Sequence, residues 1–219
     1  MPVHVRYLHG FASGPNSGKG QQLGQALAGS VASYAVVDLE GGDFTHLTLE
    51  AMRARAIAAC PSGAPLLLIG SSLGGWLAAE LAARRALPNL AGLLLIAPAF
   101  GFTARWQERL GADGLAAWRR EGYRLFFHHG AQRELPLAVA FLDSCAAADP
   151  CPGPPGRPCV IVHGREDETV PPRVALDYAL AHPEVELHLV RGDHRLGQPQ
   201  HIALLAHLAR ALIEQAEQR

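Results

Sequence analysis

The sequence of 219 residues contains no run of about 18 uncharged apolar residues, the length that a membrane-spanning helix requires. It has no excess charge of either sign, because 19 lysines and arginines stand against 20 aspartates and glutamates. Bulk electrostatics therefore favour binding neither to nucleic acid nor to an anionic membrane. The first residues follow a strand pattern and not that of a secretory signal peptide. These absences predict a cytoplasmic protein without nucleic acid as a partner and leave its oligomeric state open.

Cysteine is sparse, and its spacing fits no metal site. The four cysteines have neither zinc-ribbon spacing nor the density of a secreted disulfide scaffold; they are Cys60, Cys145, Cys151 and Cys159. Residues 14–20 resemble a phosphate-binding loop, but this stretch has one residue too few between its glycines. It also has Gly20 where a magnesium-binding hydroxyl is needed. We therefore expect free thiols, no metal, and no nucleotide or other cofactor.

Short apolar segments alternate with helical patterns along most of the chain. Strands are expected at residues 3–8, 34–39, 66–69, 93–96, 158–162 and 184–190, and helices at 18–28, 48–60, 73–86, 171–181 and 200–215. Continuously apolar strands separated by helices are typical of a parallel sheet covered on both faces. The length suits one domain over residues 1–219. The sequence thus predicts an α/β fold with a mainly parallel sheet of about six strands.

The alternation is interrupted between residues 97 and 158, where the sequence shows no clear strand. Helical patterns are expected at residues 101–120 and 135–147. We interpret residues 99–157 as a small helical cap over the strand ends, where open α/β sheets bind ligands. The alternative is a longer crossover packed on the sheet edge. Three aromatic side chains are the expected pocket residues: Trp76, Trp106 and Trp118.

A Gly-x-Ser-x-Gly motif lies between the third expected strand and the helix that follows it. Gly70, Ser72 and Gly74 fill the motif, and strand, turn and helix is the context that it requires. A serine at such a turn presents its hydroxyl at the carboxyl edge of the sheet. Ser71 is the rival, but it has no glycine two places before or after it. The motif alone is weak evidence for a serine nucleophile. The assignment therefore depends on whether the chain also supplies a base and an acid for Ser72.

A serine nucleophile needs a base within hydrogen-bond reach and a third group that orients the base. Of eleven histidines, only His194 lies in the loop directly after the last expected strand. Asp167 lies in the loop after the fifth expected strand, which is the position for the acid in the order Ser, Asp, His. Asp193 is the other carboxylate, but a sequence neighbour of the histidine usually cannot reach back to orient it. The sequence therefore predicts a triad of Ser72, Asp167 and His194.

Acyl transfer also needs backbone N–H groups aimed at the developing oxyanion. The residue after the nucleophile, Leu73, is expected to give one of them. The other is expected from the loop after the first strand, at Phe11, which follows His9 and Gly10 in the sequence.

These motifs resemble those of the α/β-hydrolase superfamily, and in particular of small bacterial YqiA-type esterases. The resemblance is carried by Tyr7-Leu8-His9-Gly10-Phe11 with Ser13, Pro15, Ser17 and Lys19, by Gly70-Ser71-Ser72-Leu73-Gly74-Gly75, by the stretch from His163 to Pro171, and by Gly192-Asp193-His194. It implies a compact hydrolase that lacks the first two strands of the larger fold. The middle segment is longer and more aromatic than in YqiA-type sequences. It looks more like the cap of related hydrolases, including depalmitoylating ones.

The expected function is a serine hydrolase that cleaves carboxylic esters through an acyl-enzyme on Ser72. The substrate would be a small-molecule acyl ester or thioester. An acyl-protein or acyl-CoA thioesterase would use the same residues and is the nearest alternative. A binding module with a hydrolase fold is the alternative from another class, and it predicts an incomplete triad.

Overall fold

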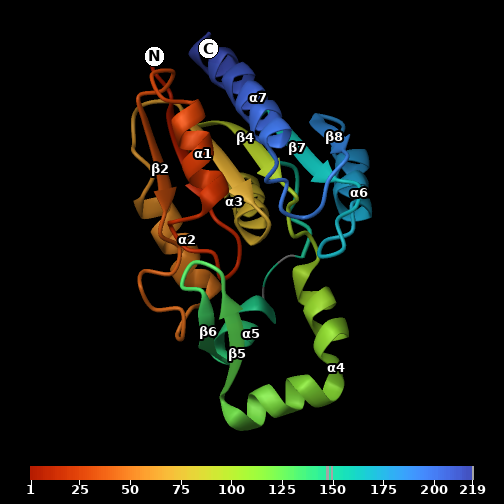
Figure 1. The fold of residues 1–219 in the computed structure, drawn as a ribbon. Helices are drawn as coiled ribbons and strands as arrows, with labels where there is room; N and C mark the ends of the chain where they lie inside the picture. Colours follow the sequence, from red (N-terminus) through yellow and green to blue (C-terminus); the bar gives the residue numbers. More distant parts are fainter. Residues whose placement is uncertain (147, 149, 219) are drawn as a thin grey trace.

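The computed structural model describes residues 1–146, 148 and 150–218 (Figure 1). The described strands form a six-stranded sheet in the order β2-β1-β3-β4-β7-β8, and each neighbouring pair is parallel. Their bounds are β1 (His4–Leu8), β2 (Ser33–Val37), β3 (Leu66–Ser71), β4 (Leu90–Ile96), β7 (Cys159–Gly164) and β8 (Val185–Val190). This confirms the predicted α/β fold with a parallel sheet.

The sheet is parallel because its central strands are apolar on both faces. Every residue of β3 and β7 is buried, whereas most residues of the edge strands β2 and β8 are half-buried or exposed. A strand with two apolar faces must be covered on both sides, and a helical connection supplies the cover. The continuous apolar runs in the sequence therefore became the interior strands.

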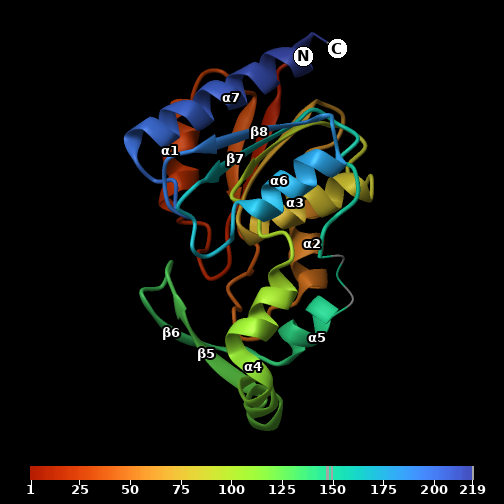
Figure 2. The same cartoon turned by 90° about the vertical axis from the view of Figure 1, so that its right-hand side faces the viewer.

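Helices cover both faces of the sheet (Figure 2). Their bounds are α1 (Gly18–Ala26), α2 (Leu49–Ala58), α3 (Leu73–Ala83), α6 (Arg173–Ala181) and α7 (Pro199–Glu217). Apolar side chains of α1 and α7 pack with one face of the strands, and those of α2, α3 and α6 pack with the other. None of the helices in the described residues is long and apolar enough to cross a membrane.

The segment between β4 and β7 differs from the prediction. It contains α4 (Phe102–Glu121), β5 (Tyr123–His128), β6 (Arg133–Ala138) and α5 (Ala140–Ala146), and β5 pairs with β6 in an antiparallel hairpin. The expectation of a segment without strands is therefore wrong. The expected helix at residues 135–147 begins only at Ala140, and Ala147 lies outside the described residues.

Local chemistry explains why this segment forms a hairpin. Pro136 would remove a hydrogen bond from a helix interior, but it is tolerated in the two-stranded β5–β6 pair. Along β5 the side chains alternate, with Phe126 half-buried while Leu125 and Phe127 are exposed. Because the exposed positions are apolar, the period of two is hidden in the sequence. Helix α4, by contrast, agrees with the expected range and is kinked at Gly111, where φ is 64°.

The inserted segment lies beyond the carboxyl ends of the sheet strands, at the opposite end of the molecule from the two termini (Figures 1 and 2). Its buried apolar side chains belong to the same core as those of α2, α3 and α6; they are Phe102, Trp118, Leu137, Phe141, Leu142 and Cys145. The insertion is thus packed onto the domain and faces the loops that follow the strands.

Candidate active site

Ser72 occupies a strained turn between β3 and α3. Its φ of 54° and ψ of −117° are rare for a residue with a side chain. The surrounding backbone holds this conformation, because the Ser72 N–H donates to the Ile96 carbonyl at 2.9 Å. The Ser72 carbonyl accepts from the N–H groups of Gly75, Trp76 and Ala99 at 2.9, 3.0 and 3.0 Å. The turn lifts the hydroxyl away from both elements.

The glycines of the motif are required by close backbone contacts. A Cβ at Gly70 would collide with the backbone of Gly74 and Gly75. A Cβ at Gly74 would collide with the carbonyl groups of Leu8 and His9 at the end of β1. The turn therefore fits only because β1, β3 and the first turn of α3 approach one another without side chains between them.

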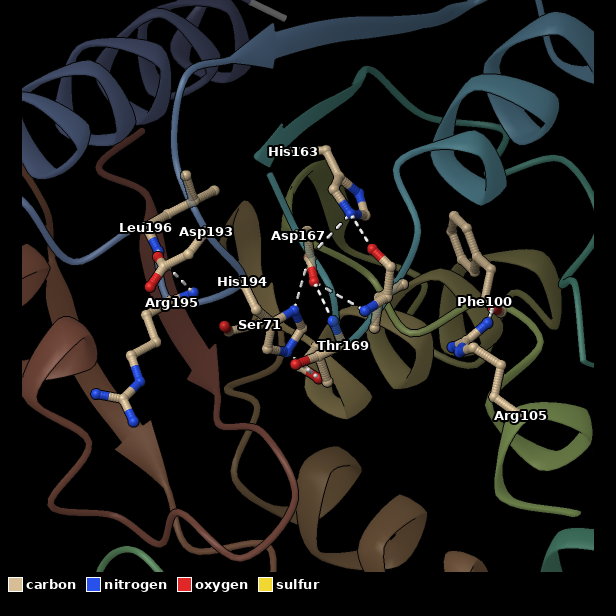
Figure 3. A network of polar contacts seen from close by, with 12 residues as sticks. Ser71, Phe100, Arg105, His163, Asp167, Thr169, Asp193, His194, Arg195 and Leu196 are labelled. Atoms are coloured by element: carbon tan, nitrogen blue, oxygen red, sulfur yellow. Dashed lines mark hydrogen bonds and ion pairs between the residues drawn. The ribbon is translucent and has the colours of Figure 1, made fainter. Parts of the chain in front are cut away.

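The structure brings Ser72, His194 and Asp167 together from three separate loops. Figure 3 shows His194 beside Asp167. His194 lies in the loop after β8, and its Nε2 is 3.0 Å from Ser72 Oγ. Its Nδ1 is 2.7 Å from Oδ2 of Asp167, which lies in the loop after β7. Since the carboxylate can only accept, Nδ1 carries the proton and Nε2 is left to accept from the Ser72 hydroxyl.

The Asp167 side chain is 0% exposed and fully hydrogen-bonded. Oδ1 accepts from the N–H groups of Thr169 and Val170 at 2.9 and 2.8 Å, and Oδ2 lies 3.1 Å from Nε2 of His163 as well as against His194. Burial raises the pKa of this carboxyl, but hydrogen bonds from His163, His194 and Val170 outweigh burial and hold the pKa well below its ordinary range. Asp167 is therefore a fixed, ionised acceptor.

The two rival residues have other partners. Asp193 Oδ1 accepts from the N–H groups of Arg195 and Leu196 at 3.1 and 3.2 Å, which closes a local turn. The Ser71 hydroxyl accepts from Nζ of Lys19 at 3.2 Å. Neither residue stands in the hydrogen-bonded chain through His194.

A cavity of about 1400 Å³ opens in front of Ser72 and His194. The loop after β1 lines it through Gly10 and Phe11, and the insertion lines it through α4 and the β5–β6 hairpin. The Phe11 ring contacts the insertion, with centroids 5.0 Å from Trp106 and 5.4 Å from Phe126. One wall of the cavity is therefore aromatic.

Phe11 and Leu73, the expected oxyanion-hole residues, both line this cavity beside Ser72. Within the described part of the chain, neither the Phe11 N–H nor the Leu73 N–H donates a hydrogen bond. Leu73 is the first residue of α3, where N–H groups have no partner inside the helix. Both positions thus offer a free donor to a bound oxygen.

Only one of the three expected pocket tryptophans lies in the cavity wall. Trp106 lines the cavity, whereas Trp76 and Trp118 are 0% and 1% exposed and do not. For these two the prediction is wrong, because they fill the core. Trp76 packs edge-on against Phe102 at 5.2 Å, and Trp118 donates its indole N–H to the Leu137 carbonyl at 3.0 Å. Aromatic content alone does not distinguish a core residue from a pocket residue.

Several cavity residues were not identified from the sequence. The hairpin contributes Arg124, Leu125, Phe127 and His129, and α1 contributes Lys19. Nothing in the sequence indicates that the hairpin residues line a cavity, because the pattern of β5 and β6 does not identify them as strands. Lys19 stood in the amino-terminal signature, and only its contact with Ser71 shows what it faces.

The tip of the hairpin is fixed to the loop that contains Phe11. His128 Nδ1 accepts from the Ala131 N–H at 3.0 Å, so its Nε2 donates to the buried Glu40 carboxylate at 2.8 Å. The His129 N–H donates to the carbonyl of Ala12 at 2.7 Å, and Ala12 has a φ of 53°. The hairpin thus helps to hold an unfavourable backbone conformation next to Phe11.

Replacing His128 by alanine should leave the buried Glu40 carboxylate without its partner. We expect the free energy of unfolding to fall by about 3 kcal/mol, the scale on which losing one member of a buried pair destabilises a protein. Urea unfolding followed by circular dichroism measures this change. His129→Ala is the matched control, because this side chain is exposed, and it should change stability by less than about 0.5 kcal/mol. Equal effects of the two substitutions would contradict the assignment.

Solved structures with a similar fold were found in several organisms. Alpha/beta hydrolase domain-containing protein 10 from mouse has a TM-score of 0.80 and 23% identity, over 97% of this chain and 90% of that chain. Est1E from Butyrivibrio proteoclasticus has a TM-score of 0.76 and 16% identity, over 100% and 89%. The esterase domain of a Rhodothermus marinus protein has a TM-score of 0.62 and 21% identity, over 95% and 85%. At these identities the likeness shows the fold, which is that of α/β hydrolases.

The sequence was also compared with curated proteins and with family models. No curated protein matches it. The predicted resemblance to YqiA-type members of the α/β-hydrolase superfamily is confirmed by a family model. The model is that of the uncharacterised protein family UPF0227, and because it matches residues 4–209, the chain belongs to this family.

Proposed function

We propose that the protein is a serine hydrolase that cleaves carboxylic esters through an acyl-enzyme on Ser72. The observation that carries the proposal is the chain of hydrogen bonds from Ser72 Oγ through His194 to Asp167 at the wall of a large cavity. The similar solved structures include an alpha/beta hydrolase domain-containing protein, an esterase domain and a lipolytic enzyme, which supports hydrolysis as the reaction class.

In the first half of the reaction, Ser72 Oγ attacks the acyl carbon and His194 Nε2 takes the hydroxyl proton. His194 becomes an imidazolium, which the ionised Asp167 stabilises through Nδ1. The negative charge moves to the carbonyl oxygen, to which the N–H groups of Phe11 and Leu73 donate hydrogen bonds. Each such donor lowers the barrier by about 3 kcal/mol. The bond to the alcohol then breaks, and His194 Nε2 returns the proton to the leaving oxygen.

In the second half, water takes the place of the alcohol. His194 Nε2 removes a proton from this water, whose oxygen attacks the acyl carbon of the ester on Ser72. The same N–H groups bind the second oxyanion. The Ser72 oxygen leaves with the proton from His194, and the carboxylic acid is released. Every proton transfer passes through one nitrogen that already lies 3.0 Å from Ser72 Oγ.

The inserted segment, residues 99–157, acts in this proposal as a cap over the reacting groups. Its aromatic side chains Trp106 and Phe126 pack against Phe11 and form one wall of the cavity with it. An apolar wall beside the nucleophile suits an acyl group with aliphatic or aromatic character. Est1E, one of the proteins of similar fold, has been solved with ferulic acid bound.

Two alternatives share the fold. A thioesterase would use the same hydrogen-bonded residues and differ only in its leaving group, a thiolate. A binding module would not need a hydroxyl, an imidazole and a carboxylate joined by hydrogen bonds, so the observed geometry disfavours it. Ester turnover separates the binding module from the enzyme, and the choice of leaving group separates the two enzymes.

A matched series of p-nitrophenyl esters and acyl thioesters of the same chain lengths tests this proposal. We expect Ser72-dependent release of p-nitrophenol with kcat/KM of roughly 10⁴ M⁻¹s⁻¹ or more for the best ester, at the lower end of enzymes. Intact-mass measurement after rapid quenching should detect one acyl group on the chain. Absence of turnover with every ester and thioester of the series would contradict the proposed hydrolase function. A thioester preference of more than about tenfold at every length would replace it with the thioesterase.

A further inference from the structure

Lys19 enters the candidate active site from the first turn of α1. Its Nζ donates to Ser71 Oγ at 3.2 Å, one residue before the proposed nucleophile, and the side chain is half-buried in the wall of the cavity. Within the described residues, no carboxylate forms an ion pair with this ammonium group. An ammonium has three donors, and the neutral Ser71 hydroxyl uses one of them. Lys19 therefore presents N–H donors beside Ser72 that no carboxylate of the described chain contacts directly.

The rest of the cavity wall adds to this charge. Besides Lys19, its charged lining residues are Arg105, Arg109, Arg124, Arg195, Glu166, Glu168 and Asp193. Cations outnumber carboxylates there, although the whole chain has a net charge of −1. Figure 3 shows Arg105 and Arg195 on either side of His194. The lining cations come from α1, α4, β5 and the loop after β8, so they are not confined to one element.

Two of the three lining carboxylates are already used inside the protein. Glu166 accepts a hydrogen bond from the Gly192 N–H, and Asp193 accepts from the N–H groups of Arg195 and Leu196. Asp193 and the buried Asp167 act on Lys19 only through space, and the lining cations still outnumber the lining carboxylates. Partly burying cations without matching anions is unfavourable unless a ligand supplies the negative charge.

We propose that the substrate is an ester that carries a negatively charged group, such as a carboxylate, and that Lys19 binds this group next to the reacting carbonyl. The inference rests on the proposed esterase function and specifies its substrate class. The arginines Arg105 and Arg124 of the insertion attract the anion into the cavity, and Lys19 determines the preference at the nucleophile. The aromatic wall of Phe11, Trp106 and Phe126 then receives the apolar part of the substrate.

The protonation of Lys19 gives this preference a pH dependence. Burial lowers the pKa of Lys19 to about 8, although Asp193 and Asp167 in the loops after β8 and β7 raise it. From β1 the group faces Tyr7, whose pKa burial raises to about 12, so that this phenol is neutral in the same range. Lysine is charged below its pKa. The preference for an anionic ester should therefore be present near neutral pH and decline as the pH rises through about 8.

The test compares mono-p-nitrophenyl adipate with p-nitrophenyl hexanoate, which have acyl chains of equal length that end in a carboxylate or a methyl group. The measured quantity is the ratio of kcat/KM for adipate to that for hexanoate at about pH 6.5 and low salt, where Lys19 is charged. We expect a ratio of about ten or more in the wild-type protein, the scale of one charge-assisted contact. Lys19→Met should lower the ratio about tenfold, and Lys19→Arg should restore part of it.

Arg133→Met is the matched control, because it removes a positive charge from the exposed end of β6, outside the cavity. It should leave the ratio unchanged. In the wild-type protein the ratio should decline towards the Lys19→Met value at about pH 9.5, whereas the ratio of Lys19→Met should not change with pH. Titrations that affect both esters equally cancel in the ratio.

A wild-type ratio near one, with Ser72-dependent hydrolysis of hexanoate, would overturn the anionic substrate class and leave the esterase standing. An equal loss on both esters in Lys19→Met would also overturn it, because Lys19 would then support the turn at Ser71 and not bind charge. Absence of turnover of both esters would remove the esterase and this inference together.

Discussion

Ser72→Ala is expected to lower kcat/KM for p-nitrophenyl hexanoate by at least about 10⁴-fold, the scale on which removing a serine nucleophile acts in triad enzymes. The substitution deletes the oxygen that forms the acyl bond and leaves His194 without the proton that it accepts at 3.0 Å. The remaining rate would come from binding and from the oxyanion donors alone. Initial rates of p-nitrophenol release measure the loss.

Ser71→Ala is the matched control for this substitution. It removes the neighbouring hydroxyl, which accepts from Lys19, and should lower kcat/KM for hexanoate by less than about tenfold. Circular dichroism should show the same fold for both variants, because alanine removes only one oxygen at either position. An active Ser72→Ala variant beside an inactive Ser71→Ala variant would show that the wrong serine had been assigned.

Asp167→Asn is expected to lower kcat/KM by about 10⁴-fold with the fold intact, as the loss of the acid does in other triads. The introduced amide oxygen would keep the bonds from the N–H groups of Thr169 and Val170, which places the NH₂ group towards His194 Nδ1. Nδ1 would then have to accept. The imidazole proton would move to Nε2, which could no longer accept from Ser72.

The control for the acid is Asp193→Asn. The Asp193 side chain closes a turn with the N–H groups of Arg195 and Leu196, which an amide oxygen can still do. We expect kcat/KM for hexanoate to stay within about tenfold of the wild-type value. Equal losses in Asp167→Asn and Asp193→Asn would contradict the role given to Asp167, since only one of them contacts His194.

The sheet could be predicted because its strands are apolar on both faces and are separated by helical patterns. β3 and β7, in which every residue is buried, were found within two residues of their bounds. The meeting of Ser72, Asp167 and His194 in space followed from topology. Parallel strands place their carboxyl ends at one edge, so the loops after β3, β7 and β8 had to lie together.

The insertion could not be predicted in the same way. The exposed residues of β5, Tyr123, Leu125 and Phe127, are as apolar as its inward-facing Phe126, so the strand period is not visible in the sequence. The burial of Trp76 and Trp118 depends on packing between α3, α4 and the hairpin, which are distant in the chain. The charge of the cavity likewise arises from residues of α1, α4, β5 and the loops after β7 and β8.

The central claim, that Ser72 is the nucleophile, is tested most directly by labelling with a fluorophosphonate, which forms a covalent adduct with an activated serine. The labelled protein is digested and the modified residue is identified by mass spectrometry. We expect one adduct on Ser72 in the wild-type protein and none in the Ser72→Ala variant. Full labelling of that variant, or an adduct on Ser71 in the wild-type protein, would contradict it.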